Sequence, residues 1–386
     1  MGHPDVILLA GYLVRCPLGG YAWQVLHYLA GLRALGFDPY FYEDTAYYGD
    51  CFDPRTGNMH VDPEVGVTFA TEFFRHFGFG DRWVFWDAAR DRHFGLSREA
   101  AAALIDEASL AITLAPVNRL PRRPRQRKLF IDIDPTFTQI RVAEGDRKLY
   151  ELLAEHDRHF TIGENIGTPA SAIPVAPFDW RPTRQPIALE FWEPLAGDAA
   201  APFTTVGRWD ERRRDVRFQG EVYSWSKRVE WMKFLDLPAR TGARFCVAMD
   251  VDKLPADVAL LRQHGWEIAD PLAVSRDALV YRDFIRRSRG EFTVAKDVNV
   301  RLASGWFSDR AACYLAAGRP VITQDTGFGR FLPTGEGLFA FRTQEDAVAA
   351  FATLAADYES HARSARRIAE EYFDARRVLR DMLAQL

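Results

Sequence analysis

The segment SGWFSDRAACYLAAGRPVITQDTGFG, residues 304–329, combines a helix start with side chains that could bind an anion. Ser308 is a favourable N-cap for a helix over 309–317, and the first turn holds Asp309 and Arg310. An acid suits the positive end of a helix dipole, whereas an arginine does not. We therefore predict that an anionic ligand lies near this N-terminus, bound by free N–H groups and by the guanidinium. The alternative is a well-capped helix with a purely structural role.

Two further segments of this half could contact a phosphate or a sugar. Lys296 ends a predicted strand over 292–296, where its charge could neutralise a departing diphosphate. Thr326, Gly327 and Phe328 form the loop after the next predicted strand. Glycine in such a loop lets the backbone approach a ligand closely. The structural alternatives are a surface lysine and an ordinary turn.

The elements that must position these residues are predicted by the pattern of the whole chain. Apolar strand-like segments alternate with helical ones over 5–165, and a second alternating series covers 203–358. A proline-rich stretch, 167–186, separates the two series. Strand, helix, strand is typical of doubly wound parallel sheets. We predict an α/β fold with two Rossmann-like domains facing a cleft, in which ligands lie beyond the carboxyl ends of the strands. The predicted boundaries are 1–178 for the N-terminal domain, 179–370 for the C-terminal domain and 371–386 for a helix that packs back on the first domain.

The segment 304–329 resembles the donor-nucleotide region of GT-B glycosyltransferases, which have two facing Rossmann-like domains and bind a nucleotide-sugar in the C-terminal one. The similarity rests on a helix followed by Ala-Ala-Gly-Arg-Pro-Val-Ile, a strand and a Thr-Gly loop. Gly305 and Cys313 stand where retaining members carry glutamates. SDRAACYLAAGRP is also similar to the Arg-x-x-Glu-x-x-Ala-x-Gly segment of spore-maturation-type GT-B proteins. The positions that match the pattern of the retaining members are Phe307, Ala316, Gly318, Pro320 and Val321.

This resemblance implies a glycosyltransferase that moves a sugar from a UDP-, GDP- or dTDP-linked donor to a small hydroxylated acceptor, without a metal or another cofactor. It implies that Arg208 contacts the diphosphate and that the loop with Gly19 and Gly20 faces the donor phosphate and the acceptor. Asp309 would replace the missing glutamate contact to the ribose. The predicted donor-binding residues are Arg208, Lys296, Ser308, Asp309, Arg310, Tyr314, Thr326, Gly327 and Phe328. The predicted acceptor-side residues are Gly19, Gly20 and Asp44.

Carboxylates that could act as a general base follow strands of the N-terminal half. Asp132 and Asp134 end the segment KLFIDIDP, and Asp44 ends PYFYEDT. Inverting transfer needs a carboxylate or an imidazole within reach of the acceptor hydroxyl, so Asp132 and Asp134 are the candidate catalytic residues. A retaining enzyme would need no dedicated base. Two aromatic clusters, 42–53 and 75–87, are interpreted as N-domain loops that pack together or contact the acceptor.

Two other functions fit the same architecture. A nucleotide-sugar epimerase would convert its donor without an acceptor, and a nucleotide-sugar sensor would bind it without turnover. The Asp-x-Asp at 132–134 also resembles the metal-binding motif of GT-A glycosyltransferases. A second such triplet, DVD at 250–252, makes that motif a weak signal in this chain.

Composition narrows the partners that we expect. The 386 residues carry a formal net charge of −4, which argues against general binding to nucleic acid, so we expect no nucleic acid partner. The basic segments 119–128 and 208–217 are interpreted as solvated loops or as a phosphate-facing rim. The 4 cysteines are scattered, which favours reduced thiols over disulfides or a zinc site. No apolar run approaches the roughly 20 residues that span a bilayer, and no signal-peptide pattern precedes the first strand, so we expect a cytoplasmic protein.

Overall fold

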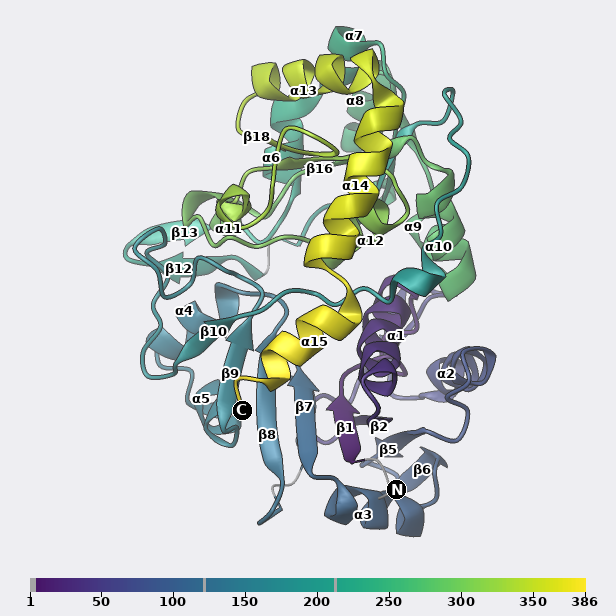
Figure 1. Ribbon diagram of the computed structural model, residues 1–386, viewed down its shortest axis with the longest axis vertical. Coiled ribbons are helices and arrows are strands. Elements are labelled where there is room, and N and C mark those ends of the chain that lie inside the picture. The colour runs from purple at the N-terminus through teal and green to yellow at the C-terminus, as the bar shows by residue number, and fades with distance from the viewer. Residues whose placement is uncertain (1–4, 121–122, 212–213) are drawn as a thin grey trace.

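The computed structural model describes residues 5–120, 123–211 and 214–386, which form two α/β units, one in the lower and one in the upper half of Figure 1. The α/β class and the two doubly wound units that the alternation predicts are confirmed. Residues 121–122 and 212–213, which belong to the two basic segments, lie outside the described residues. The predicted phosphate-facing rim is therefore not tested there.

The N-terminal unit is built on an eight-stranded sheet in the order β10-β9-β8-β7-β1-β2-β5-β6. Every neighbouring pair is parallel except β5 with β6. The strand order reverses between β1 and β7. Residues VILLA of β1 are all buried, as expected for a parallel strand covered by helices on both faces. The strands are β1 (Val6–Ala10), β2 (Asp38–Asp44), β5 (Trp83–Asp87), β6 (Arg92–Gly95), β7 (Leu110–Leu114), β8 (Arg127–Asp132), β9 (Arg158–Thr161) and β10 (Trp180–Pro182). The helices are α1 (Gly19–Ala34), α2 (Glu64–His76), α3 (Arg98–Glu107), α4 (Phe137–Ala143) and α5 (Arg147–Ala154).

Three segments of this unit differ from the sequence-based expectation. The aromatic cluster 75–87 is not a loop, because its second half forms β5, whose Trp83 and Phe85 are buried. A strand buried on both faces has no polar alternation to reveal it. The cluster 42–53 ends in a short hairpin of β3 (Cys51–Asp53) and β4 (Asn58–His60). The proline-rich stretch contributes β10 to the first sheet, which therefore extends past residue 178.

The C-terminal unit contains a six-stranded parallel sheet in the order β15-β14-β11-β16-β17-β18, and its strand order reverses between β11 and β16. A hairpin of β12 (Val216–Phe218) and β13 (Glu221–Tyr223) follows β11. The sheet strands are β11 (Phe203–Gly207), β14 (Phe245–Met249), β15 (Trp266–Ile268), β16 (Gly290–Thr293), β17 (Val321–Gln324) and β18 (Leu338–Phe341). The helices are α6 (Arg228–Trp231), α7 (Leu237–Thr241), α8 (Pro255–Gln263), α9 (Pro271–Ser275), α10 (Ala278–Arg287), α11 (Asp297–Arg301), α12 (Asp309–Ala316), α13 (Gln344–Ala356), α14 (Tyr358–Tyr372) and α15 (Ala375–Leu383).

The last helix joins the two units. In Figure 1, α14 runs along the C-terminal unit and α15 crosses onto the N-terminal unit beside α1. The contact with α1 is close, because a Cβ at Gly31 would lie 2.6 Å from Cδ1 of Leu379 and 2.8 Å from Cβ of Ala375. The backbone of Ile187, in the crossover between the units, donates to Phe373 and accepts from Ala375. These contacts fix the chain end against both units.

A second close contact lies at the start of α1. A Cβ at Gly19 would lie 2.5 Å from Cβ of Tyr281 and 2.9 Å from the carbonyl oxygen of Asp277, so only glycine lets α1 approach α10 this closely. Trp23 of α1 donates from Nε1 to the Ala278 carbonyl at 2.7 Å. The two units are therefore packed together at the entrance of the cleft. Within the described ranges, none of the helices combines the length and apolar character that a bilayer crossing requires.

Candidate functional site

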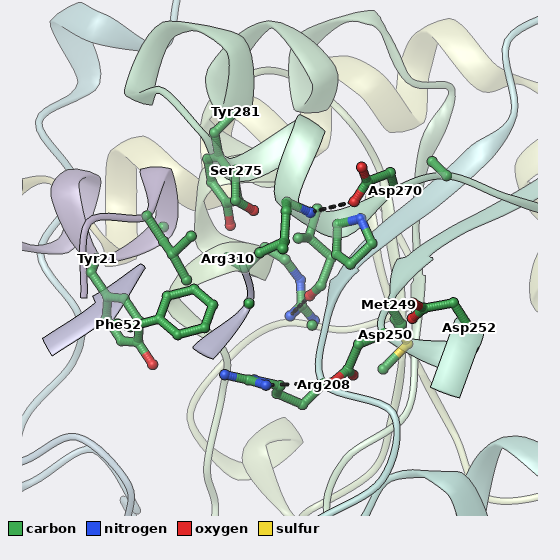
Figure 2. Close-up of a pocket in the computed structure, with 18 of the residues that line it drawn as sticks. Tyr21, Phe52, Arg208, Met249, Asp250, Asp252, Asp270, Ser275, Tyr281 and Arg310 are labelled. Carbon is green, nitrogen blue, oxygen red and sulfur yellow. Dashed lines mark hydrogen bonds and ion pairs between the residues drawn. The ribbon is translucent and has the colours of Figure 1, made fainter. Parts of the chain in front are cut away.

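A cavity of about 730 Å³ lies between the two units. Its N-terminal wall comes from the β1–α1 loop and the β3–β4 hairpin, and its C-terminal wall comes from the carboxyl ends of β11, β14 and β15 with the start of α12. Figure 2 shows Tyr21 and Phe52 on the side opposite Met249 and Asp250. Ligands of open α/β sheets bind at such strand ends. The charged and polar residues that line the cavity are Tyr21, Thr56, Asn58, Arg208, Asp250, Asp252, Lys253, Asp270, Ser275, Tyr281, Asp309 and Arg310.

The N-terminal wall is held by a buried carboxylate. Glu43, at the end of β2, accepts hydrogen bonds from the backbone N–H groups of Leu13, Val14 and Arg15 at 2.7–2.9 Å. The Nε atom of Arg15 also donates to it at 3.0 Å. Burial raises the pKa of Glu43, while these donors oppose that shift. These hydrogen bonds fix residues 13–15 of the loop between β1 and α1, and Gly20 at the start of α1 lines the cavity.

Arg208 extends from the end of β11 into the cavity (Figure 2). Its side chain is half exposed and its Nη1 lies 3.4 Å from Oδ2 of Asp250. The other oxygen of that carboxylate, Oδ1, accepts from the backbone N–H of Trp209 at 2.8 Å. The guanidinium lies 5.8 Å from the ring centre of Phe52, across the cleft. This long, exposed ion pair leaves most of the guanidinium available to an anion in the cavity.

Arg310 also lines the cavity, but its charge is already matched. Its Nε donates to Oε1 of the buried Glu291 at 2.5 Å, and its other nitrogens donate to the Val206 carbonyl and to Oγ1 of Thr293. Burial lowers the pKa of Arg310, but the charge of Glu291 and the hydrogen bond to it contribute to a net rise above the ordinary value. The prediction of an anion-binding arginine at this helix therefore needs a correction. Arg310 lines the cavity, but its guanidinium is bound to residues of the sheet that packs against α12.

The start of α12 is capped differently from the prediction. The helix begins at Asp309, and the side chain of its N-cap residue Ser308 makes no capping hydrogen bond. Instead, Oδ1 of Asp309 accepts from the backbone N–H of Arg310 at 2.8 Å. Burial raises the pKa of Asp309. Asp309 lines the cavity, whereas Ser308 is buried beside it.

Lys227 is a half-buried lysine behind the cavity wall that the sequence analysis does not identify, and it does not itself line the cavity. Its Nζ lies 5.7 Å from the ring centre of Trp306, and within the part of the chain that the structure describes it has no hydrogen-bond or ion-pair partner. Burial, with the charges of Arg310 and Lys296 nearby, lowers the pKa of Lys227 to about 7. In the sequence it is separated from Arg208 by the β12–β13 hairpin, so no local spacing relates the two.

Lys296 and Asp134 form an ion pair between the two units. The Nζ atom of Lys296 lies 2.9 Å and 3.0 Å from the two carboxylate oxygens of Asp134. Asp134 follows β8 of the first sheet, and Lys296 precedes α11 of the second unit. Of the two candidate catalytic residues, Asp134 is the one that reaches the opposite unit, but neither Asp134 nor Lys296 lines the cavity.

Asp132 and Asp44 are structural, which corrects their predicted roles. Asp132 is buried at the end of β8 and accepts from Oγ1 of Thr138 at 2.9 Å and from Nε2 of Gln139 at 2.7 Å. Burial raises the pKa of Asp132 to about 7. Asp44 is fully buried and accepts from the backbone N–H groups of Ala46 and Arg119. Neither carboxylate lines the cavity.

The other predicted donor contacts are also packed away from the cavity. Tyr314 is fully buried, with its hydroxyl 2.6 Å from Oγ1 of Thr204. Thr326 donates to the Trp306 carbonyl at 2.6 Å, and Phe328 is buried. Gly327 has φ +88°, and a Cβ there would lie 2.4 Å from Nδ2 of Asn165, so its glycine serves the contact between the units. Gly19 serves the α1–α10 contact, and only Gly20 of that pair lines the cavity.

No group of three or more metal-ligating side chains of the kind His, Cys, Asp or Glu occurs among the residues that the structure describes. The four cysteines, Cys16, Cys51, Cys246 and Cys313, are all free thiols. The charged residues that line the cavity are Arg208, Lys253, Arg310 and the aspartates Asp250, Asp252, Asp270 and Asp309.

Comparison with known proteins finds likeness in structure alone. No family model and no curated protein matches the sequence. An α-glucosyltransferase in complex with UDP and a 13-mer DNA is 12% identical, with a TM-score of 0.63 over 99% of each chain. A sucrose-phosphate synthase from Thermosynechococcus elongatus is 14% identical, with a TM-score of 0.54 over 99% of this chain and 98% of that one. A glycosyltransferase involved in avilamycin A biosynthesis is 11% identical, with a TM-score of 0.57 over 99% and 97%.

These neighbours correct one expectation and confirm another. The prediction of no nucleic acid partner, drawn from the net charge of −4, is contradicted, because an enzyme of the same fold is found in complex with DNA. Charge summed over a chain says little about the potential inside one cleft. The resemblance carried by residues 304–329 is confirmed at the level of architecture. This chain has the GT-B fold of glycosyltransferases, with two Rossmann-like domains facing a cleft.

Proposed function

We propose that this protein is a glycosyltransferase that binds a nucleotide-sugar in the interdomain cavity and transfers the sugar to an acceptor hydroxyl. The observation that carries the proposal is the position of the cavity, at the carboxyl ends of β11, β14 and β15 and beside the reversal of strand order in the second sheet. Ligands of open α/β sheets bind at such points. The neighbours in complex with UDP support the same ligand class.

The cavity has the size and the two chemical ends that such a donor needs. Its volume of about 730 Å³ falls in the range of small-molecule sites, roughly 300–1,000 Å³. The side formed by Met249, Ile268 and Leu272 is apolar and suits a nucleobase. The side that carries the exposed guanidinium of Arg208, with Lys227 behind the wall, is cationic and suits a diphosphate.

Lys227 is the cation best placed to respond to a diphosphate. Its ammonium group forms no ion pair or hydrogen bond within the described ranges, although the charges of Glu291 and Asp309 act on it, and burial lowers its pKa to about 7. A diphosphate beside it would favour the charged form, because an opposite charge nearby raises the pKa of a lysine. Arg310 is less able to respond because Glu291 already neutralises it.

The transfer itself would be metal-independent. The acceptor oxygen forms a bond to the anomeric carbon while the bond from that carbon to the phosphate oxygen breaks, and the nucleoside diphosphate leaves with the electron pair. Arg208 and Lys227 would stabilise the negative charge on the leaving diphosphate. The acceptor proton passes either to a base of the protein or to the departing phosphate, according to whether the configuration is inverted or retained.

Calorimetric titration of the full chain tests this proposal. UDP, GDP, dTDP and their glucose conjugates are titrated with and without Mg²⁺, into the native protein and into Lys227→Met. The expected result is micromolar binding of one nucleotide, weakened about tenfold or more in Lys227→Met, which corresponds to roughly 1.4 kcal/mol. Lys148→Met, at an exposed lysine of the N-terminal unit, is the matched control and should bind as the native protein does. Failure of every nucleotide to bind would remove the proposal.

Acceptor dependence then identifies the reaction. The nucleotide-sugar that binds is incubated with hydroxylated small molecules, saccharides and duplex DNA, and release of the nucleoside diphosphate is measured. We expect release to rise at least tenfold over slow hydrolysis in the presence of one hydroxyl-bearing acceptor. Conversion of the sugar without any acceptor would instead identify an epimerase, and binding without turnover would identify a sensor.

A further inference from the structure

The loop that follows β8 makes two side-chain contacts to the opposite unit. Asp134 binds Nζ of Lys296 through both carboxylate oxygens, at 2.9 Å and 3.0 Å. Two residues on, the hydroxyl of Thr136 donates to Oδ1 of Asn299 at 3.1 Å, inside the interface. Lys296 and Asn299 belong to one short segment at the start of α11. The loop therefore holds the α11 segment at two points one helical turn apart.

The backbone of this loop is strained. Thr136 has φ +85°, a conformation that a β-branched residue rarely adopts. Its N–H donates to Oε1 of Gln139 at 2.7 Å, so the conformation is held from its own side as well as by Asn299. Strain of this kind persists only where the surroundings over-determine it, and it is found in segments that switch between arrangements.

The ammonium group of Lys296 is enclosed by aromatic rings as well as by Asp134. Its Nζ lies 3.7 Å from the ring centre of Trp225 and 4.9 Å from that of Phe137. The two rings are themselves 3.7 Å apart between their centres. Phe137 belongs to the N-terminal unit, whereas Trp225 follows the β12–β13 hairpin of the C-terminal unit. The position of Lys296 thus depends on groups from both units.

The hairpin itself lies against the N-terminal unit. Phe218 and Tyr223 are buried in one apolar cluster with Phe137 and Ile140 of α4. Arg301 of α11 keeps the hairpin attached to its own unit, because its Nη1 donates to the Val222 carbonyl at 3.0 Å. We use the term interdomain clasp for three elements together: the loop 134–137, the α11 segment 296–299, and the β12–β13 hairpin with Trp225. Arg208 precedes this hairpin and Lys227 follows it, so the clasp lies between the two cations of the proposed site along the chain.

We propose that Asp134 is a positioning residue that places Lys296 only when the two units are closed, and that the interdomain clasp thereby couples closure to the cationic end of the cleft. Lys296 is close enough to Lys227 that its charge contributes to the low pKa of that lysine. This inference rests on the proposed function, because the diphosphate is the ligand on which the cations act. Asp134 acts through Lys296 and does not itself touch the reacting atoms.

The test measures the clasp and the reaction separately. Amide hydrogen exchange of the full chain is compared for the native protein, Asp134→Asn, Lys296→Met and the double variant. The same four proteins are then titrated with UDP. Their turnover is measured with the nucleotide-sugar donor that the binding panel identifies. Protection of residues 134–143 and 216–225 should fall equally in the two single variants and no further in the double variant. Asp134→Asn should lower turnover at least tenfold while the dissociation constant for UDP changes less than threefold.

Two further variants serve as controls for the loss of the Asp134 carboxylate. Glu151→Gln removes a carboxylate of the same unit that pairs with Arg147 on the exposed face of α5, and it should match the native protein in both measurements. Asp134→Glu, which keeps the charge, should recover most of the protection. Unchanged exchange in Asp134→Asn, or effects that multiply in the double variant, would overturn the proposal. A native protein that binds no nucleotide would refute the proposed function, while the exchange measurements would still decide whether the clasp exists.

Discussion

Arg310 and Glu291 form a buried ion pair in which Nε of the arginine donates to Oε1 of the carboxylate at 2.5 Å. Glu291 lies in β16, and the same guanidinium donates to the carbonyl of Val206 in β11. Arg310 therefore ties the first turn of α12 to the two central strands of the second sheet. The helix-dipole argument predicts that Arg310 binds a ligand, whereas in the structure Arg310 neutralises the buried Glu291.

Removal of Arg310 should therefore cost stability before it costs binding. Arg310→Ala leaves Glu291 as an unpaired buried charge, and breaking such a pair lowers the free energy of unfolding by about 3–5 kcal/mol. Urea denaturation of the single variant measures this loss. Arg310→Met with Glu291→Leu removes both charges and should recover most of the stability. An Arg310→Ala variant as stable as the native protein would show that the Arg310–Glu291 ion pair does not stabilise the fold.

Nucleotide binding should depend on the protonation of Lys227. Its pKa is lowered to about 7, so the free protein carries the charge below pH 7 and loses it as the pH rises through that value. The dissociation constant for UDP, measured from pH 6 to pH 8.5, should therefore rise by about tenfold. Lys227→Arg keeps its charge over this range, so the same titration should give a nearly flat profile. Equal slopes for both proteins would assign the pH dependence to another group.

Asp132 should show itself as a structural carboxyl group in the pH dependence of stability. Its folded-state pKa is raised to about 7 from 3.8, so the folded protein binds the proton more tightly than the unfolded chain. The stability from this group is complete below pH 4 and is lost as the pH rises through 7. Asp132→Asn should therefore unfold at a higher temperature than the native protein at pH 8, with little difference at pH 5, by scanning calorimetry. Loss of turnover in a folded Asp132→Asn variant would instead return Asp132 to the catalytic candidates.

The two glycines at the start of α1 should respond differently to alanine. A Cβ at Gly19 would lie 2.5 Å from Cβ of Tyr281, whereas a Cβ at Gly20 would come no nearer than 3.5 Å to that residue. Gly19→Ala should push α1 away from α10, lowering the unfolding temperature and weakening binding of UDP at least tenfold. Gly20→Ala should leave the unfolding temperature within about two degrees of the native value. Thermal unfolding followed by titration separates the two outcomes.

The elements of this fold were largely readable from local patterns. The run VILLA and the segment SLAITL predict buried strands because a parallel strand covered on both faces is apolar throughout. The Ser-Asp start and the glycine at 318 bound α12 to within a residue or two. The aromatic strand β5 was not predicted, because buried aromatic residues such as Trp83 and Phe85 give the same sequence pattern in a packed loop as in a buried strand.

The sequence by itself determined the class of fold, the alternation of elements and the segments that end at the cleft, because these follow from periodicity and capping along a few residues. Only the tertiary structure decided which charges are free. Glu291 neutralises Arg310 from 19 residues away, and Asp134 binds Lys296 from 162 residues away. The ammonium group of Lys227 is left without an ion pair among the described residues. A charge pair depends on burial and on distance in space, and neither quantity is encoded in the spacing of residues along the chain.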